Sequence, residues 1–251
     1  MFNITNDGRN ILSDLYTTYP TNGSAAPWTF DPFPSNVVGV IALSSSPYAL
    51  TAYLRDPVER IIALCLPNTS SAPGGFSEMQ PNSFGYFIGV KSIVIKNRSI
   101  NVGTNATTKI STLDPYTKFR TDVYNSVVQR FSRVTKRIPP AKLVAPFGLC
   151  FNTSVNGTKV GVRVPDIDLV LWDGKKWTIS SANSIKQVTE DVACLAFVDG
   201  GATSEHPIVV GTYKFEDNFL LFDLENSSFG FSSSLLRRQT SCSNFNFTLT
   251  Y

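Results

Sequence analysis

The sequence predicts an all-β protein, and two observations carry this prediction. Phe, Tyr, Val, Ile and Thr recur in short runs that Gly, Pro, Asn and Ser interrupt, which is typical of strands joined by tight turns. Only one segment has the apolar spacing of a helix, and no fixed-period repeat is present. With 251 residues and 42% apolar content, the chain can bury a sizeable core.

Short apolar runs mark the strands of the first third of the chain. They predict strands at residues 11–18, 37–43 and 61–66. Residues 67–82 are rich in Ser, Gly, Pro and Asn, which predicts a linker. Residues 85–95 then alternate well enough to form a strand that opens a second unit. We therefore expect a domain boundary at about residue 82.

One helix is predicted after residue 120. Apolar side chains three or four positions apart share one face of this helix: Val123, Val127, Phe131 and Val134. Thr121 or Asp122 is suited to cap its start. Pro139-Pro140 ends it, because proline lacks the amide hydrogen and clashes with the preceding turn.

A β-hairpin is predicted over residues 164–180. Its turn is Asp173-Gly174, a dipeptide that favours the tight turns of hairpins. Trp172 and Trp177 flank this turn, and we interpret them as a packed cross-strand pair rather than as a platform for a sugar ring. The rest of the chain reads as strands and turns, and Glu216-Asp217 is interpreted as one of the turns.

The charge and hydropathy of the chain argue against two classes of partner. The formal net charge is +3 and the pI is about 8.6, far from the clustered Lys and Arg density of a nucleic-acid groove. No segment has the length and apolarity of a membrane span. We therefore expect neither nucleic acid nor a membrane as partner, whereas an acidic protein is compatible with this charge.

Neither a metal site nor a cofactor is expected. The four cysteines stand far apart without a Cys-x-x-Cys pair, so two disulfides fit better than a zinc or redox site. The single histidine, His206, has no second ligand or nucleophile pattern beside it. Glu190 and Asp191 are neighbours, and neighbouring side chains on a strand point to opposite faces, which argues against a proton-sharing pair.

Asn-x-Ser/Thr sequons indicate secretion. Chance would give roughly four in a chain so rich in Ser and Thr. Nine are present, at Asn3, Asn22, Asn68, Asn97, Asn105, Asn152, Asn156, Asn226 and Asn246. The first residues lack the basic and apolar regions of a signal peptide. We therefore expect a secreted protein whose N-terminal part is missing from this chain, and we leave its oligomeric state open.

Three segments near the C-terminus resemble the closing strands of a pepsin-like aspartic protease lobe. They are residues 208–211 (Ile-Val-Val-Gly), 217–223 and 229–231 (Phe-Gly-Phe). A protease of this kind needs an Asp-Thr-Gly or Asp-Ser-Gly turn from each lobe, because one carboxylate activates water while its protonated partner polarises the scissile carbonyl. The sequence contains neither tripeptide. The resemblance therefore implies a pepsin-like fold without protease chemistry.

A more specific resemblance extends from about residue 37 to the end of the chain. The segments that carry it are residues 86–93, 108–116, 144–147 and 242–248. They are similar to a plant group that comprises extracellular dermal glycoproteins, seed basic globulins and aspartic-protease-like xylanase inhibitors. This resemblance implies an all-β, pepsin-like fold with few short helices. In it, residues 83–251 form a complete second lobe, and residues 1–82 form a remnant of the first lobe and a linker.

The same resemblance identifies a degenerate catalytic turn and two disulfides. Ser111-Thr112-Leu113 stands where the second-lobe Asp-Ser/Thr-Gly is expected, so Ser111 replaces the aspartate and Leu113 the glycine. A serine hydroxyl cannot ionise near neutral pH or share a proton as a carboxylate pair does, so neither a catalytic residue nor enzyme activity is expected. The implied disulfides are Cys150 with Cys194 and Cys65 with Cys242.

Inhibitors of this group insert second-lobe loops into the substrate cleft of a secreted glycoside hydrolase, where basic side chains meet the cleft carboxylates. By position, Arg237 and Arg238 lie on one such loop, before the last cysteine. Lys136 and Arg137 lie on a second candidate loop. The xylanase inhibitors carry a histidine near the position of Arg238. We therefore expect a cell-wall inhibitor of microbial xyloglucan-cleaving enzymes, with xylanases as the other target class.

Two alternative functions remain open at this point. A non-inhibitory, storage-like glycoprotein of the same group would bind peptides, polysaccharide or no particular ligand. An aspartic endopeptidase follows from likeness of fold alone, and the missing aspartates argue against it. Arg237 and Arg238 also have a plainer interpretation as solvated surface charges. The basic residues after the helix, Arg133, Lys136 and Arg137, have one as charges that complement the helix dipole.

Overall fold

The structure, a computed structural model, describes residues 5–6, 9–10, 61–66, 74–82, 85–103, 106–155, 158–159, 162–224, 226–232 and 234–244. The strands expected at 11–18 and 37–43 lie outside the described residues. Strands dominate the described part, which agrees with the predicted all-β class. The strand expected at 61–66 is present as β3 (Ile61–Cys65).

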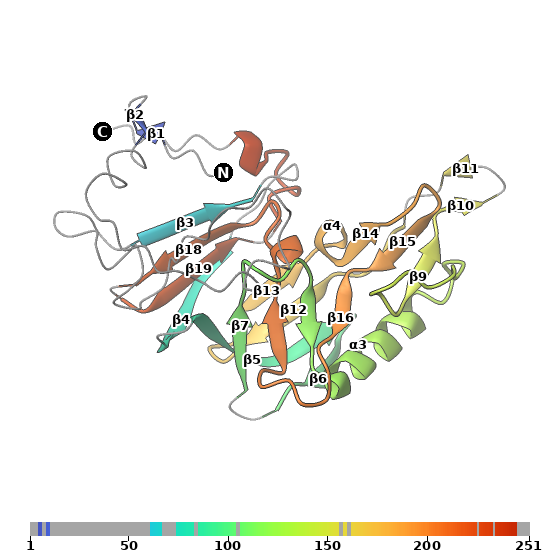
Figure 1. Cartoon of the computed structure of the whole chain (residues 1–251), viewed down its shortest axis with the longest axis horizontal. Coiled ribbons are helices and arrows are strands. Elements are labelled where there is room, and N and C mark those ends of the chain that lie inside the picture. The colour runs from blue at the N-terminus through green and yellow to red at the C-terminus, as the bar shows by residue number, and fades with distance from the viewer. Residues whose placement is uncertain are drawn as a thin grey trace, which may run out of the picture.

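Twelve of the described strands belong to one branched sheet (Figure 1). The order along its main path is β16 (Phe197–Asp199), β8 (Thr117–Phe119), β17 (Ile208–Val210), β7 (Thr107–Ile110), β5 (Gly85–Ile95), β4 (Gly74–Asn82), β19 (Ser228–Ser232), β18 (Phe219–Asp223) and β3. Three further strands branch from β5: β6 (Arg98–Asn101) and β12 (Ile167–Leu171) pair with it directly, and β13 (Lys176–Ile179) pairs with β12.

Smaller elements complete the described fold. The strands outside the main sheet are β1 (Thr5–Asn6) with β2 (Arg9–Asn10), β10 (Ser154–Val155) with β11 (Thr158–Lys159), and the set β14 (Ile185–Gln187), β15 (Val192–Leu195) and β9 (Cys150–Asn152). The helices are α3 (Thr121–Val134), α4 (Ser181–Ser184), and the 3-10 turns η2 (Thr212–Lys214) and η3 (Cys242–Asn244). None of the described helices is long and apolar enough to cross a membrane.

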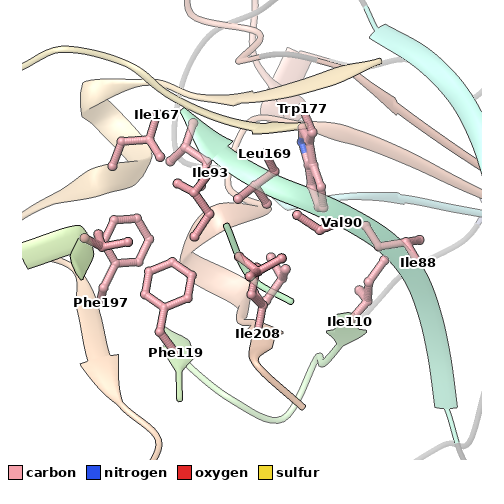
Figure 2. Close-up of a cluster of buried hydrophobic side chains, with 14 of the residues drawn as sticks. Ile88, Val90, Ile93, Ile110, Phe119, Ile167, Leu169, Trp177, Phe197 and Ile208 are labelled. Carbon is pink, nitrogen blue, oxygen red and sulfur yellow. The ribbon is translucent and has the colours of Figure 1, made fainter. Parts of the chain in front are cut away.

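The long strand β5 connects the two halves of the sheet. Its first half pairs with β4 and β7, and its second half pairs with β6 and β12. The pairing of β5 with β12 shifts by one residue at Lys91. The shift lets Ile88 and Val90 before it and Ile93 and Ile95 after it all face the same core. Figure 2 shows Ile88, Val90 and Ile93 in one core with Phe119 of β8 and Phe197 of β16, and Ile95 belongs to the same cluster.

The prediction of a linker at residues 67–82 is wrong for residues 74–82. Gly74–Asn82 forms β4, which pairs with β19 on one side and with β5 on the other. Gly, Ser and Pro have low strand propensity, but two neighbouring strands offer their backbone groups to this segment, and tertiary pairing outweighs local preference. The sheet therefore joins strands from both sides of the expected boundary at residue 82, and the division into two lobes stays a prediction.

The predicted helix is confirmed as α3, but its predicted cap is wrong. Its buried side chains are Val123, Val127 and Phe131, which are three of the four predicted from spacing. The N-cap position is Arg120, without a side-chain capping bond, and Thr121 and Asp122 already lie inside the helix. Asp122 instead forms an ion pair with Arg120, at 2.7 Å from Oδ1 to Nε. A carboxylate in the first turn also complements the helix dipole.

The hairpin is confirmed as β12 and β13, but the two tryptophans do not pair. Trp177 lies opposite Leu169 and is fully buried against Phe215, Phe229 and Phe231. Trp172 lies beyond the end of β12 and is 45% exposed. Its ring covers Gly89, where an added Cβ would stand 2.1 Å from the indole. In the observed register Trp177 pairs with Leu169 and Trp172 has no partner on β13, so of the two tryptophans only Trp177 lies in the core.

Candidate functional site

The turn that the resemblance predicts to be a degenerate catalytic turn follows β7, and the side chain of Ser111 closes it. The backbone N–H of Ser111 donates to the Val210 carbonyl at 2.9 Å, which fixes the turn against β17. The buried Ser111 hydroxyl accepts the backbone N–H groups of Leu113 at 3.3 Å and Asp114 at 3.2 Å. Ser111 therefore has a structural role in this turn, and its hydroxyl is engaged with the backbone.

The segment after β17 clamps this turn from the other side. The N–H of Thr212 donates to the Asp114 carbonyl at 2.8 Å, and the N–H of Tyr213 donates to the Pro115 carbonyl at 3.0 Å. Gly211 directly precedes Thr212, and a Cβ added to Gly211 would stand 2.5 Å from the Tyr116 carbonyl oxygen. Only glycine fits here, so the close approach of the two segments depends on it.

Asp114 is the carboxylate of this turn, and its partner is a lysine. Lys118 Nζ lies 2.5 Å from its Oδ1. Burial alone would raise the pKa of Asp114, but hydrogen bonds from Lys118 and Ser111 and the charges of Lys118 and Lys109 together hold it below its ordinary value. An ionised carboxylate paired with a lysine differs from the proton-sharing carboxylate pair of an aspartic protease.

The predicted basic loop that contains Lys136 and Arg137, residues 133–142, is named here the helix-end loop. Its backbone is fixed to β9, because Asn152 N–H donates to the Pro139 carbonyl at 2.8 Å and Ala141 N–H to the Cys150 carbonyl at 3.0 Å. Lys136 and Arg137 are exposed, and neither forms an ion pair within the described part of the chain.

Beyond the helix-end loop the chain returns to the degenerate turn. Phe147 packs edge-on against Tyr116, with 4.8 Å between ring centroids. Ala141 and Val144 join the same apolar cluster, which also contains Tyr213 of η2 and the disulfide between Cys150 and Cys194. One cluster thus supports both the degenerate turn and the helix-end loop, so the two keep a fixed relation to each other.

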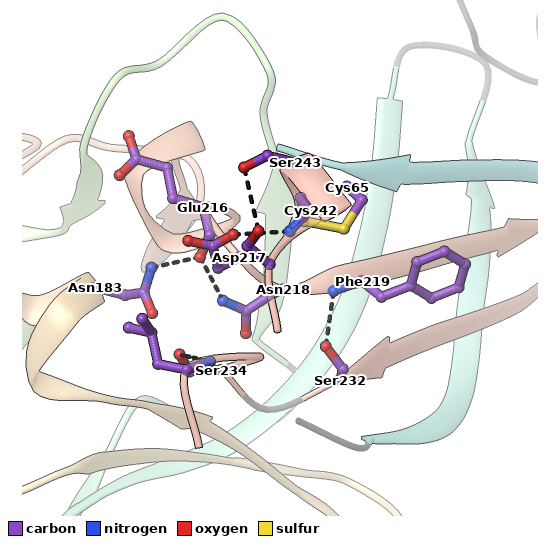
Figure 3. Close-up of a disulfide and its surroundings, with 12 residues drawn as sticks. Cys65, Asn183, Glu216, Asp217, Asn218, Phe219, Ser232, Ser234, Cys242 and Ser243 are labelled. Carbon is purple, nitrogen blue, oxygen red and sulfur yellow. Dashed lines mark hydrogen bonds between the residues drawn. A yellow bond between two sulfur atoms is a disulfide. The ribbon is translucent and has the colours of Figure 1, made fainter. Parts of the chain in front are cut away.

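The predicted basic loop that contains Arg237 and Arg238, residues 235–242, is named here the C-terminal loop. Both of its ends bind Asp217. Leu235 N–H donates to the Asp217 carbonyl at 2.6 Å. Cys242 N–H donates to the Asp217 Oδ1 at 3.0 Å, as Figure 3 shows. Asp217 is buried, has a φ of +50°, and donates its own N–H to the Leu66 carbonyl. Asp217 therefore lies in a turn, as interpreted from the sequence, and this turn also anchors both ends of the C-terminal loop.

A disulfide strengthens the same anchor. Figure 3 shows Cys65 of β3 bonded to Cys242 beside Asp217. The structure thus contains both pairings that the family resemblance implies, with Cys150 bonded to Cys194 in the second. The first crosslink spans 177 residues of sequence, and the chain-entropy estimate for such a span is roughly 5 kcal/mol.

The two arginines of the C-terminal loop have different surroundings. Arg237 forms an ion pair with Asp166, the residue before β12. Arg238 is exposed and has no ion-pair partner among the described residues. Gln239 follows with a φ of +57°, which turns the chain back toward Cys242. No hydrogen bond or ion pair within the described ranges joins the C-terminal loop to the helix-end loop, so the two predicted contact loops stay separate.

A buried lysine near the C-terminal loop was not predicted. Lys214 of η2 is 1% exposed, and its Nζ donates to Asn218 Oδ1 at 3.0 Å and to the Thr178 carbonyl at 3.3 Å. The same nitrogen lies 4.7 Å from the centroid of the Trp177 ring. Burial lowers the pKa of Lys214 to about 7. Sequence reasoning had no signal for it, because lysine is rarely buried.

Three predicted glycosylation sites lie in the described part. Asn97 is exposed at the turn between β5 and β6, and Asn226 is exposed and donates to Asp223. Asn152 is partly buried, and its Oδ1 accepts Ser154 N–H at 2.9 Å. The other six, Asn3, Asn22, Asn68, Asn105, Asn156 and Asn246, lie outside the described residues. His206 contacts Thr107 and the Phe87 ring, and the described residues contain no group of three side chains suited to a metal.

Comparison with known proteins identifies relatives of this chain. It is 46% identical over 192 residues to "Probable aspartic proteinase GIP2" of Nicotiana benthamiana, covering 72% of this chain and 44% of that protein. It is 41% identical over 247 residues to "Gamma conglutin 1" of Prunus dulcis, covering 85% and 57%. The chain therefore spans about half the length of these two relatives.

A solved structure and a family profile agree with these relatives. The crystal structure titled "edgp" matches with a TM-score of 0.77 and 32% identity over 90% of this chain and 67% of that one, so the mostly-β architecture is that of the pepsin-like group. Residues 85–233 match the profile described as "Xylanase inhibitor C-terminal". The chain belongs to this xylanase inhibitor C-terminal family, as the sequence resemblance predicted.

Proposed function

We propose that this protein is a secreted, catalytically inactive inhibitor that binds a microbial cell-wall glycoside hydrolase through the C-terminal loop. The observation that carries this proposal is the doubly anchored loop that leaves Arg238 exposed and without an ion pair among the described residues. Membership of the xylanase inhibitor C-terminal family supports it. Two disulfides fit an oxidising, extracellular location.

The chemistry of the degenerate turn supports the absence of protease activity. Ser111 cannot supply a carboxylate, and its hydroxyl holds the backbone of its own turn. Asp114 is paired with Lys118 and has its pKa lowered, so it is a poor donor of a proton to a scissile carbonyl. Leu113, at the former glycine position, is 60% exposed and changes the shape of the turn.

An arginine on a rigid loop is suited to blocking a hydrolase cleft. Glycoside hydrolases present two carboxylates beside the scissile bond. The guanidinium of Arg238 can donate paired hydrogen bonds to one of them. Because Asp217 and the disulfide fix both ends of the loop, little conformational entropy is lost on binding. Arg237, held by Asp166, positions its neighbour.

The helix-end loop is the second candidate contact, through Lys136 and Arg137. For the target, we propose xyloglucan-cleaving enzymes ahead of xylanases, because an arginine stands near the position where the xylanase inhibitors of the resembled group carry a histidine. Inhibition of both enzyme classes by the purified protein should be measured side by side.

Arg238→Ala tests the proposal directly. We expect the Kd for the inhibited hydrolase to rise at least about tenfold, or roughly 1.4 kcal/mol, because the main cleft contact is lost. Lys91→Ala is the matched control, since Lys91 is equally an exposed cation but lies on the strand β5 and belongs to neither loop. Equal effects of the two substitutions, or an unchanged Kd for Arg238→Ala, would contradict the assigned contact.

A storage-like, non-inhibitory glycoprotein is the second candidate function. The relative named "Gamma conglutin 1" favours it. Failure of the purified protein to bind any xylanase or xyloglucanase would select this alternative. An endopeptidase would be revealed by pepstatin-sensitive cleavage at acid pH, and we expect none.

A further inference from the structure

A continuous basic segment surrounds the C-terminal end of α3. Residues 123–165 contain seven lysines and arginines and no aspartate or glutamate. The whole chain has 19 acidic residues in 251, so a stretch of this length would hold about three on average. The charge of this segment is therefore not balanced within its own sequence.

The fold brings two more cations to this segment. The guanidinium of Arg130 donates to the Ile95 carbonyl at 3.1 Å and to the Lys96 carbonyl at 2.8 Å, which holds the β5–β6 turn beside α3. The resulting α3 basic surface consists of six exposed cations: Lys96, Arg98, Arg133, Lys136, Arg137 and Lys142. They come from one turn, one helix end and one loop, and Arg130 connects the turn to the helix.

Several cations elsewhere in the described structure have acidic partners, whereas those of this surface have none among the described residues. Elsewhere, acidic residues pair with Lys118, Arg120, Lys175, Lys176 and Arg237. None of the six members of the α3 basic surface forms an ion pair with a described residue.

The composition of the surface selects the kind of ligand. Protein interfaces are built around a buried core of apolar and aromatic side chains with charges at the rim. Here six exposed cations lie in or beside the segment, and of the exposed large apolar side chains in the described part, only Leu143 lies in the segment. Long, solvated lysines and arginines suit a flexible polymer with regularly repeated negative charges, which they can neutralise one after another.

We propose that the α3 basic surface binds a linear polyuronate, a polysaccharide with one carboxylate on each sugar. Such binding would hold the protein on a carboxylated polysaccharide matrix. The proposal does not depend on hydrolase inhibition, because Arg238 lies on the C-terminal loop. It assigns Lys136 and Arg137 mainly to the polysaccharide, so the two functions are separable by substitution.

The test compares two triple variants of equal net charge in binding to immobilised polygalacturonate. Arg133→Gln, Lys136→Gln and Arg137→Gln remove three cations of the surface, and Lys91→Gln, Lys175→Gln and Lys176→Gln remove three exposed cations elsewhere. Each set lowers the formal net charge from +3 by 3, to 0. A glycan on Asn97 would cover one end of the surface, so the variants change only the other end.

We expect the unaltered protein to bind polygalacturonate but not a neutral arabinoxylan, with an affinity that falls as salt rises. The first triple variant should bind at least about tenfold more weakly, and the second within about twofold of the unaltered protein. Equal losses in both variants would show that net charge alone drives retention and would overturn the proposal. Unchanged polygalacturonate binding by the first triple variant would also overturn the proposal, in particular if that variant lost hydrolase affinity.

Arg238→Ala separates this proposal from the hydrolase proposal. It should leave polygalacturonate binding unchanged while it weakens hydrolase binding. If polygalacturonate binding also fell about tenfold with Arg238→Ala, the α3 basic surface would not be the polysaccharide site, whatever the outcome for the hydrolase.

Discussion

The two basic loops of this protein carry the same residue types in opposite settings. The C-terminal loop is fixed at both ends by Asp217 and by the disulfide between Cys65 and Cys242, and one of its two arginines is paired. The helix-end loop belongs to an acid-free segment whose exposed cations have no ion-pair partners among the described residues. A single oriented arginine suits a defined carboxylate, whereas several unpaired cations suit a repetitive polyanion.

Removal of the disulfides should have the largest effect of the tests that compare the two loops. Cys65→Ser with Cys242→Ser should cost roughly 5 kcal/mol of unfolding free energy, and Cys150→Ser with Cys194→Ser roughly 4, because the loops closed span 177 and 44 residues. Urea denaturation measures both. Hydrolase affinity should fall mainly in the first variant, since its disulfide anchors the C-terminal loop. The reverse order of the two affinity losses would contradict the assignment of the loops.

The buried lysine beside the C-terminal loop predicts a pH effect. Burial lowers the pKa of Lys214 from 10.5 to about 7, so between these pH values the unfolded chain binds a proton that the folded chain does not. Stability should therefore rise with pH across this range, and the full penalty of a buried charge applies below pH 7.

Lys214→Met should remove that pH dependence. Its unfolding free energy should exceed that of the unaltered protein at pH 6 and should change less between pH 7 and 10 in urea titrations. Lys186→Met is the control, because Lys186 is only partly buried and lies over the Tyr213 ring. If both variants kept the original slope, Lys214 would not be the titrating group.

A smaller effect is expected from the Asp217 anchor. Asp217→Ala removes the oxygen that accepts Cys242 N–H and places alanine at a φ of +50°, so it should cost about 1–3 kcal/mol and weaken hydrolase binding. Asp217→Asn keeps an acceptor oxygen and tolerates this backbone conformation, so it should restore most of the hydrolase affinity. Polygalacturonate binding should be unaffected by either. Equal hydrolase affinity of the two variants would show that the anchor does not orient Arg238.

Local patterns predicted the elements whose side chains repeat regularly. The spacing of Val123, Val127 and Phe131 gave α3, because a helix buries one face whatever it packs against. The Asp173-Gly174 turn gave the hairpin. The same reasoning failed at residues 74–82, where two neighbouring strands supply the hydrogen bonds of β4. It also failed at Trp172, because the register of a short hairpin is set by its turn.

The sequence alone was sufficient for the family, the absence of an Asp-Thr-Gly or Asp-Ser-Gly tripeptide from these 251 residues and the basic character of the two loops, since each depends on residue identity. The tertiary structure decided which cations are paired, that Lys214 is buried and that Asp217 holds both ends of the C-terminal loop. These properties depend on segments far apart in the chain, such as Leu66, Asp217 and Cys242. Only folding brings such segments within hydrogen-bond distance, so no local pattern records them.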